Sequence, residues 1–205
     1  MRRNRLVTPE IITFDGVFEK VSGNVSNYIG NDGICGAAYY GKGHIFIELP
    51  ECRGVRWGFN AKHCTLEYSN KLYRTQDAFY KAGFAPAPLR RALVVFENDI
   101  RFSKGRVFSE SCYGIVSRLI RYTDAYRHLL FKSKGKKAWN YYFELAERYN
   151  ESNLSDHNPE GRQKFCDNVR AFLNVTKLEC KVKYRHTKDC IYDKAKQKWQ
   201  LIDIT

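Results

Sequence analysis

The chain has 205 residues and no apolar run that approaches about 18 residues, the length that a membrane-spanning helix requires. A basic cluster, Met1-Arg2-Arg3-Asn4-Arg5, stands at the N-terminus, but no apolar segment follows it, so we expect no secretory signal peptide. Internal repeats and low-complexity tracts are also absent. These absences disfavour a membrane-spanning, secreted or repeat protein and predict a cytoplasmic one.

Paired cysteine motifs are missing as well. The seven cysteines are an odd number and include no Cys-x-x-Cys pair. This usage is typical of free thiols in a reducing cytoplasm and not of a disulfide framework. The spacing of Cys180, His186 and Cys190 admits a zinc site, but no second close pair of ligands accompanies them, so buried structural thiols are the stronger expectation.

Acidic residues are fewer than basic ones. The sequence holds 35 Lys and Arg against 22 Asp and Glu, which gives a formal charge of +13. Such a surplus favours acidic partners: nucleic acid, the phosphates of a nucleotide, or an acidic protein. Apolar residues at 43% and aromatic residues at 15% indicate a folded chain, long enough for one core or two small lobes.

Hydrophobic periodicity predicts a β-rich first part and a helical second part. Strands are expected near residues 11–18, 44–49, 92–96 and 112–119. A helix is expected over 62–82, ended by Gly83 and the prolines that follow. After residue 121 we expect helices near 139–149 and 162–174 and then a closing hairpin. The prediction is one compact α+β unit in two regions, 1–120 and 121–205.

Three glycines recur at a spacing of three, Gly30-x2-Gly33-x2-Gly36, between strand-like segments. Glycine lets backbone N–H groups approach phosphate oxygens, so this glycine run is a candidate nucleotide-binding loop. A glycine-rich hairpin turn explains the same pattern equally well. No Gly-Lys-Ser or Gly-Lys-Thr step follows, which excludes a Walker loop.

Three later segments extend this pattern. A helix ending in Ala82-Gly83-Phe84-Ala85-Pro86 leads into a strand, a second strand carries Tyr113-Gly114-Ile115-Val116, and a hairpin runs from His186 to Asp203. In this order the segments resemble the glycine loop, helix, hinge strand and metal-binding hairpin of the protein kinase-like family, over about residues 28–205. Its small, divergent members, including early protein kinases of some bacteriophages, are the most similar. The resemblance implies an α+β fold with a β-rich N-lobe holding one helix and a reduced, mainly helical C-lobe.

The resemblance also implies roles for individual residues. The glycine run would cover the phosphates of ATP, while Asp189 and Asp203 would hold Mg²⁺. Glu67 would be the helix glutamate that pairs with the phosphate-binding lysine, and His186 would belong to the catalytic loop. Ordinary acidity at a turn and a strand end explains Asp189 and Asp203 equally well.

Two departures weaken the implied chemistry. Glu48 stands where the family has its lysine, and two carboxylates repel unless a cation bridges them. Tyr184 stands at the catalytic aspartate and cannot act as a carboxylate base. Nearby residues that could supply the missing positive charge are Lys42, Arg53, Arg56 and Lys62. The sequence therefore favours a degenerate kinase, a binding or regulatory pseudokinase for an acidic protein or a nucleotide, with residual nucleotide-dependent phosphotransfer left open.

A rival interpretation uses Leu178-Glu179-Cys180-Lys181. A hydrophobic-Glu-x-Lys step on a strand is the second half of a PD-(D/E)xK nuclease site, in which Glu179 would hold Mg²⁺ and Lys181 would position the water nucleophile. Asp156 or Asp167 could be the other metal ligand. The net charge suits a nucleic-acid substrate, but a Glu-x-Lys step arises easily by chance in a lysine-rich segment.

Overall fold

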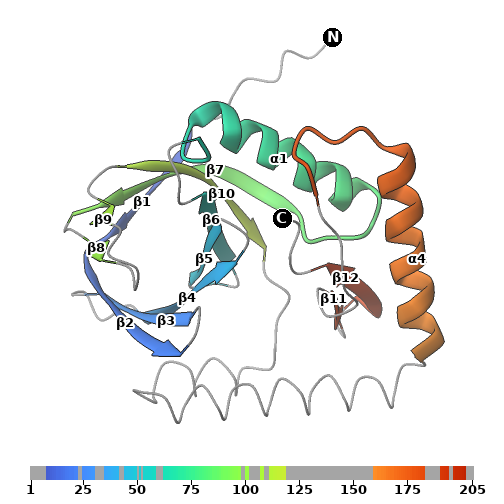
Figure 1. The fold of residues 1–205 in the computed structure, drawn as a ribbon, viewed down its shortest axis with the longest axis horizontal. Coiled ribbons are helices and arrows are strands. Elements are labelled where there is room, and N and C mark those ends of the chain that lie inside the picture. Colours follow the sequence, from blue (N-terminus) through green and yellow to red (C-terminus); the bar gives the residue numbers. More distant parts are fainter. Residues whose placement is uncertain are drawn as a thin grey trace. The chain divides into compact units, whose positions relative to one another are not determined.

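The computed structural model describes residues 8–22, 25–30, 35–41, 44–49, 51, 53–58, 62–97, 100–101, 107–108, 111–118, 159–182, 190–193 and 196–201. They form a mixed α+β protein, as expected from the sequence (Figure 1). The chain divides into two compact units, Met1–Tyr73 with Pro88–Arg118 and Arg74–Ala87 with Leu119–Thr205. Residues 74–87 belong to the second unit, and Phe79 and Ala85 lie in its core.

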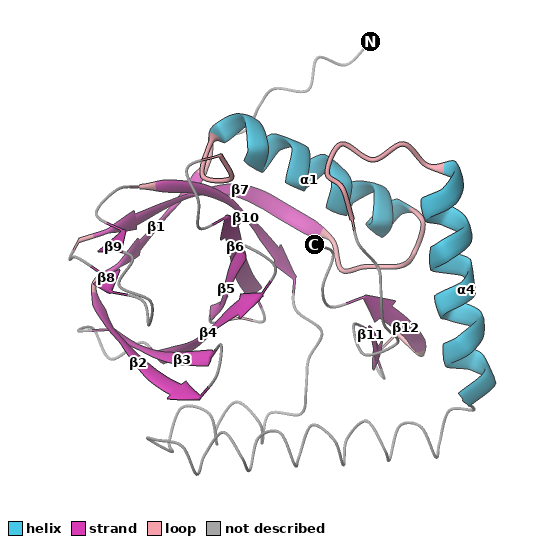
Figure 2. Ribbon diagram, viewed as in Figure 1, coloured by secondary structure: helices cyan, strands magenta, loops and turns pink. Residues whose placement is uncertain are grey.

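The first unit is built on an eight-stranded sheet with the order β1-β7-β10-β6-β5-β4-β3-β2. Its strands are β1 (Glu10–Phe14), β2 (Gly16–Ser22), β3 (Val25–Gly30), β4 (Cys35–Gly41), β5 (His44–Leu49), β6 (Arg53–Gly58), β7 (Pro88–Phe96) and β10 (Cys112–Arg118). Only β1 and β7 pair in parallel; the other neighbours are antiparallel. Figure 2 shows how strongly this sheet curves.

A small ladder of β8 (Ile100–Arg101) and β9 (Val107–Phe108) follows β7. β8 contacts β2, which lies at the sheet edge opposite β1. The two edges therefore approach each other through this ladder, and the curved sheet encloses its inner face.

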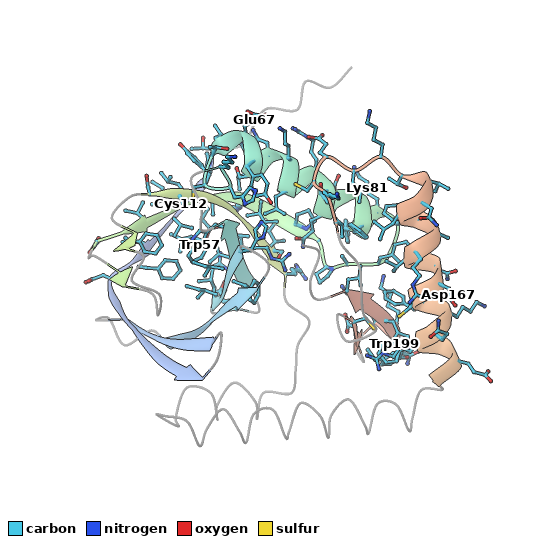
Figure 3. All side chains as sticks on the ribbon, in the orientation of Figure 1. Trp57, Glu67, Lys81, Cys112, Asp167 and Trp199 are labelled. Atoms are coloured by element: carbon cyan, nitrogen blue, oxygen red, sulfur yellow. The ribbon has the colours of Figure 1, made fainter. Side chains whose placement is uncertain are left out.

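The inner face of the sheet carries the core of the first unit. Side chains alternate between the two faces of a strand, so every second residue points inward. The core residues are Phe14, Ile45, Ile47, Leu49, Val55, Trp57, Ala92, Val94, Phe96, Cys112 and Val116. The Trp57 ring lies 5.9 Å from the Phe14 ring and 5.9 Å from the Phe96 ring, measured between centroids. Figure 3 labels Trp57 and Cys112 within this unit.

The helix α1 (Leu66–Lys81) follows β6 and has well-defined ends. Thr65 caps its N-terminus, since its Oγ1 accepts a hydrogen bond from the Tyr68 N–H at 3.1 Å. At the other end Gly83 has a φ of 81°, and Phe84 N donates to Phe79 O at 2.9 Å, which is a Schellman-type ending. The helix stop expected at Gly83 is confirmed, while the Thr65 cap moves its start to residue 66.

The second unit contains the C-terminal half of α1, the helix α4 (Pro159–Val175) and a hairpin of β11 (Cys190–Asp193) and β12 (Lys198–Leu201). Its core residues are Phe79, Ala85, Cys166, Val169, Cys190, Tyr192, Trp199 and Leu201. The Leu201 N–H donates to the Phe84 carbonyl at 2.7 Å, which fixes the hairpin against the end of α1. Neither described helix is long and apolar enough to cross a membrane.

The structure confirms the helix expected over 162–174 and the closing hairpin. The helix expected near 139–149 lies outside the described residues. The strand β6 was missed, because its sequence Arg-Gly-Val-Arg-Trp-Gly places two glycines and two arginines in a single short strand. With β6 included, the strand directly before α1 is β6 and not β5.

Candidate functional site

The glycine run lies in a β-hairpin. Gly30 is the last residue of β3, and Gly36 is the second residue of β4, where it pairs with Tyr28. Gly33 lies between these strands, outside the described residues. The structure therefore agrees with the hairpin-turn interpretation of the run. Phosphate binding by these glycines stays a prediction.

The expected metal-binding residues fall at the ends of the closing hairpin. Asp189 directly precedes β11, and Asp203 follows β12, but both lie outside the described residues, as does His186. Within the described residues, no three His, Cys, Asp or Glu side chains are grouped as a metal site would require. The hairpin itself is confirmed, and the Mg²⁺ site stays a prediction.

The zinc alternative cannot be assembled from described residues alone. Cys180 and Cys190 are both buried thiols of the second unit, 9% and 3% exposed. The third proposed ligand, His186, lies outside the described residues. The buried cysteines agree with the structural role that was the stronger expectation.

Glu67 lies in the first turn of α1, and its side chain is 77% exposed. Its Oε1 is 2.6 Å from Lys71 Nζ, one turn along the same helix. The hydrogen bond and positive charge of Lys71 lower the pKa of Glu67. The residues of this half of the helix that are buried are Ser69 and Leu72. Glu67 is therefore an exposed helix-stabilising residue in this conformation (Figure 3).

The strand immediately before α1 is β6 and not β5. The match of Glu48 with the family lysine was made on β5, and it stays a prediction. Arg56 is the basic residue in the middle of β6, 8% exposed. Its guanidinium carbon lies 5.7 Å from the centroid of the Phe46 ring, an arrangement suited to a cation–π contact.

A cluster of imidazole and phenol groups lies beside the N-terminal half of α1. His44 Nε2 and Tyr68 Oη are 2.7 Å apart, so one donates a hydrogen bond to the other. His63 stacks on His44 with 5.7 Å between ring centroids and lies 4.4 Å from the Tyr68 ring. A Cβ added at Gly58 would lie 2.0 Å from His63 Cβ, so glycine is required for this close approach. The cluster was not predicted, because His44 is far from His63 and Tyr68 in the sequence.

Glu179 and Lys181 of the nuclease interpretation lie in a segment without regular structure. Residues 176–182 follow α4 and form no strand. Glu179 makes two hydrogen bonds to Arg74, at 2.5 Å from Nε and 2.6 Å from Nη2, which raise the pKa of Arg74. Asp167 lies on α4 and bonds to Arg170, while Asp156 is outside the described residues. This geometry offers no support for a nuclease site.

Comparison of the chain with protein-family models, curated proteins and solved structures finds no significant match.

Proposed function

We propose that this protein is a kinase-like binding or regulatory protein without efficient phosphotransfer, in effect a pseudokinase. The observation that carries the proposal is the pairing of Glu67 with Lys71 on its own helix. In an active kinase the helix glutamate pairs with the phosphate-binding lysine of a strand. An exposed Glu67 held by Lys71 does not hold a strand cation in place.

The arrangement of elements around α1 supports the kinase-like part of the proposal. α1 connects β6 to β7, and β10 lies between these two strands in the sheet. This order agrees with the strand, helix, strand and hinge-strand succession that the sequence suggested. Arg56 would then be the strand cation, replacing the expected lysine. Its contact with Phe46 favours a structural role over phosphate binding.

Bound nucleotide is a secondary element of the proposal. If Mg-ATP binds, the glycine run would approach its phosphates, and Asp189 and Asp203 would hold the cation through carboxylate oxygens. Tyr184 would leave no carboxylate base at the reacting hydroxyl. Binding would then serve regulation and not turnover.

Positive charge favours an acidic protein as the main partner. The described part of the second unit carries a series of exposed basic residues, which are Arg74, Lys81, Lys164, Arg170, Lys177, Lys181, Lys196 and Lys198. Such side chains attract acidic surfaces over distances of about one Debye length, about 8 Å at physiological salt. Nucleic acid is the alternative partner of the same charge.

Phosphotransfer from labelled Mg-ATP tests the central claim. We expect no transfer to the protein itself or to a general acceptor, and we expect Glu67→Gln to behave as the parent protein. A transfer activity that drops about tenfold or more in Glu67→Gln would overturn the proposal, because it would show that Glu67 leaves Lys71 to act in catalysis.

Binding of polyglutamate and of duplex DNA separates the two partner classes. We expect polyglutamate to bind with an affinity that falls as salt rises, and Lys177→Glu with Lys181→Glu to weaken it. The matched control is Lys62→Glu, an exposed lysine of the first unit. Tighter binding of DNA at equal salt, lost in the same double variant, would favour the nucleic-acid alternative.

A further inference from the structure

The five cysteines whose thiols the structure describes are all free of disulfides, and four of them form two neighbouring pairs. Cys64 and Cys112 make one pair in the first unit, where a hydrogen bond joins their side chains. Cys166 and Cys190 make the other in the second unit, where both belong to its core. The reactivities of the two thiol pairs can therefore be compared within one chain.

Backbone contacts hold Cys64 beside Cys112. The Cys64 carbonyl accepts a hydrogen bond of 2.9 Å from the N–H of Tyr113, the residue that follows Cys112 on β10. Cys64 also packs against the core cluster that contains Cys112. The segment before α1 is therefore fixed along the start of β10, beside Cys112.

The two thiols of this pair differ in access. Cys112 is 3% exposed, whereas Cys64 is half-buried. Cys64 Sγ is also 2.8 Å from the Gly58 carbonyl, to which the thiol donates. An oxidant from solvent can thus reach Cys64 first. The buried Cys112 would be the second thiol, which reacts with the oxidised Cys64.

We propose that Cys64 and Cys112 form an oxidative modification site, which reacts with a hydroperoxide and closes an intramolecular disulfide. The site goes beyond the proposed binding function and does not depend on it. The assignment rests on the tethered backbone, the shared core and the half-buried position of Cys64.

The reaction balances in two steps. The Cys64 thiolate attacks one oxygen of hydrogen peroxide, the O–O bond breaks, and the leaving hydroxide takes up a proton to become water; Cys64 becomes a sulfenic acid. The Cys112 sulfur then attacks the Cys64 sulfur, the S–O bond breaks, and the departing oxygen leaves as a second water with the thiol proton. The two thiols lose two electrons in total, and the peroxide gains them.

Electrostatics supports the same order of attack. The hydrogen bond from Cys112 lowers the pKa of Cys64 and outweighs the opposing effect of burial. In the second pair, burial raises the pKa of Cys190 to about 11. Because the thiolate is the reactive form, Cys64 should react much faster than Cys190 at neutral pH. The second pair, Cys166 and Cys190, therefore serves as an internal control, because it is also made of two neighbouring thiols.

Peptide mapping after a brief hydrogen peroxide pulse tests the proposal on the full chain. Remaining thiols are alkylated, and the digest is analysed without reduction. We expect a Cys64–Cys112 cross-linked peptide that dithiothreitol removes, while Cys166 and Cys190 stay alkylated. Faster oxidation of Cys166 or Cys190 than of Cys64, or pairing of Cys64 with any other cysteine, would overturn the proposal.

Two variants identify the attacking sulfur. In Cys112→Ser the sulfenic acid of Cys64 should persist and be trapped by dimedone, whereas Cys64→Ser should abolish both the label and the cross-link. Cys166→Ser is the matched control and should oxidise at Cys64 as the parent does. Absence of dimedone label at Cys64 in Cys112→Ser would contradict the mechanism. If the variants fail to fold, alkylation rates of each cysteine in the parent chain decide, with Cys64 expected to be faster than Cys190.

The cross-link should also be visible as a gain in stability. It ties the segment before α1 to β10 and closes a loop that contains α1 and β7. Disulfides of this type raise melting temperatures by about 5–10 °C in chains of this size. We expect such a rise after oxidation and its loss on reduction. An oxidised protein that melts at a lower temperature would show that the disulfide distorts the fold, and would contradict the proposed pairing of Cys64 with Cys112.

Discussion

The two compact units solve the problem of burial in different ways. The first encloses aliphatic and aromatic side chains on one face of a curved sheet, whose strands hydrogen-bond to one another. Among its described residues, the second unit has one short hairpin and two helical segments, and side-chain hydrogen bonds attach the loops that join them. Thr75 Oγ1 accepts a bond from the Cys180 N–H at 3.0 Å, and Gln76 Nε2 donates to the Pro86 carbonyl at 3.1 Å.

The helix α1 contributes residues to both units. Its first half belongs to the sheet unit and its second half to the hairpin unit. Asn70 Oδ1 accepts a hydrogen bond of 3.1 Å from Arg91 on β7, while Phe79 packs 5.1 Å from Phe172 on α4, measured between ring centroids. Comparison of the two units shows that buried polar side chains of the second unit hold its loops by hydrogen bonds, whereas strand pairing holds the segments of the first unit together.

The largest effect should come from Trp57→Ala, which removes a fully buried side chain from the core of the sheet unit. Loss of such a side chain costs about 3–5 kcal/mol, because the transfer energy is lost and a cavity remains. Urea unfolding measures the loss. Hydrogen exchange should then show weakened protection in β5, β6 and β10 and retained protection in α4.

Trp57→Phe is the matched control for this change. The indole Nε1 is buried and has no hydrogen-bond partner within the described residues, so its removal sacrifices no bond seen there. The cost should be about 1–2 kcal/mol, from the smaller ring alone. Equal loss of protection in α4 and in the sheet would contradict the comparison, because the two units would then unfold as one.

Gly114→Ala should have the next largest effect. A Cβ at this position would lie 2.4 Å from the Arg56 carbonyl oxygen and 3.0 Å from Trp57 Cβ. Because the first of these contacts is with backbone, β6 and β10 must move apart, at a cost of about 3 kcal/mol or more. Thermal denaturation provides the measurement. Ser117→Ala on the same strand is the control and should cost about 1 kcal/mol; comparable losses in the two variants would refute the steric explanation.

Alkaline pH should destabilise the second unit through Cys190. Its pKa is about 11 in the fold, because of burial, against 9.0 for an ordinary thiol. Between these values the unfolded chain has lost the proton while the folded chain keeps it. The unfolded state then binds fewer protons, so the free energy of unfolding falls by about 2–3 kcal/mol as pH rises through this window.

Denaturant unfolding at pH 8, 9, 10 and 11 measures this effect, with Cys190→Ala as the reference that lacks it. Cys64 provides the opposite sign, since its pKa is lowered and its ionisation therefore favours the folded state at higher pH. The free energy of unfolding should therefore fall more steeply with pH in Cys64→Ala than in the parent, and less steeply in Cys190→Ala. Parallel pH profiles for the parent and Cys190→Ala would rule out burial of Cys190 as the cause.

Much of the fold could be predicted from local signals. Gly83 marked the end of α1, and apolar spacing marked α4, β5, β7 and β10. The strand β6 could not be recognised, because Gly54, Arg56 and Gly58 alternate with its two core residues. Arg56 is buried only because neighbouring strands and an aromatic ring surround it, and this arrangement is not visible in a single strand.

The candidate sites were less predictable than the fold. His44, His63 and Tyr68 come together from a strand, a loop and a helix, and no spacing in the sequence announces them. The same holds for Cys64 and Cys112, which meet only after β10 is placed in the sheet. Sequence patterns report periodicity within an element, whereas these groups depend on contacts between elements.

The smallest effect concerns two glycines of the second unit. Gly161 lies inside α4, where an added Cβ would find its nearest atom, Trp199 Nε1, at 3.8 Å. Gly161→Ala should stabilise the protein by about 0.5–1 kcal/mol, since alanine loses less backbone entropy in a helix. Gly83→Ala is the control: nothing lies within 4 Å of the added Cβ, yet its φ of +81° is strained for any side chain, so it should destabilise by about 1 kcal/mol. Shifts of opposite sign in the melting temperatures of the two variants would show that backbone conformation, and not free space, determines the change in stability. A higher melting temperature in both variants would refute the left-handed helix ending at Gly83.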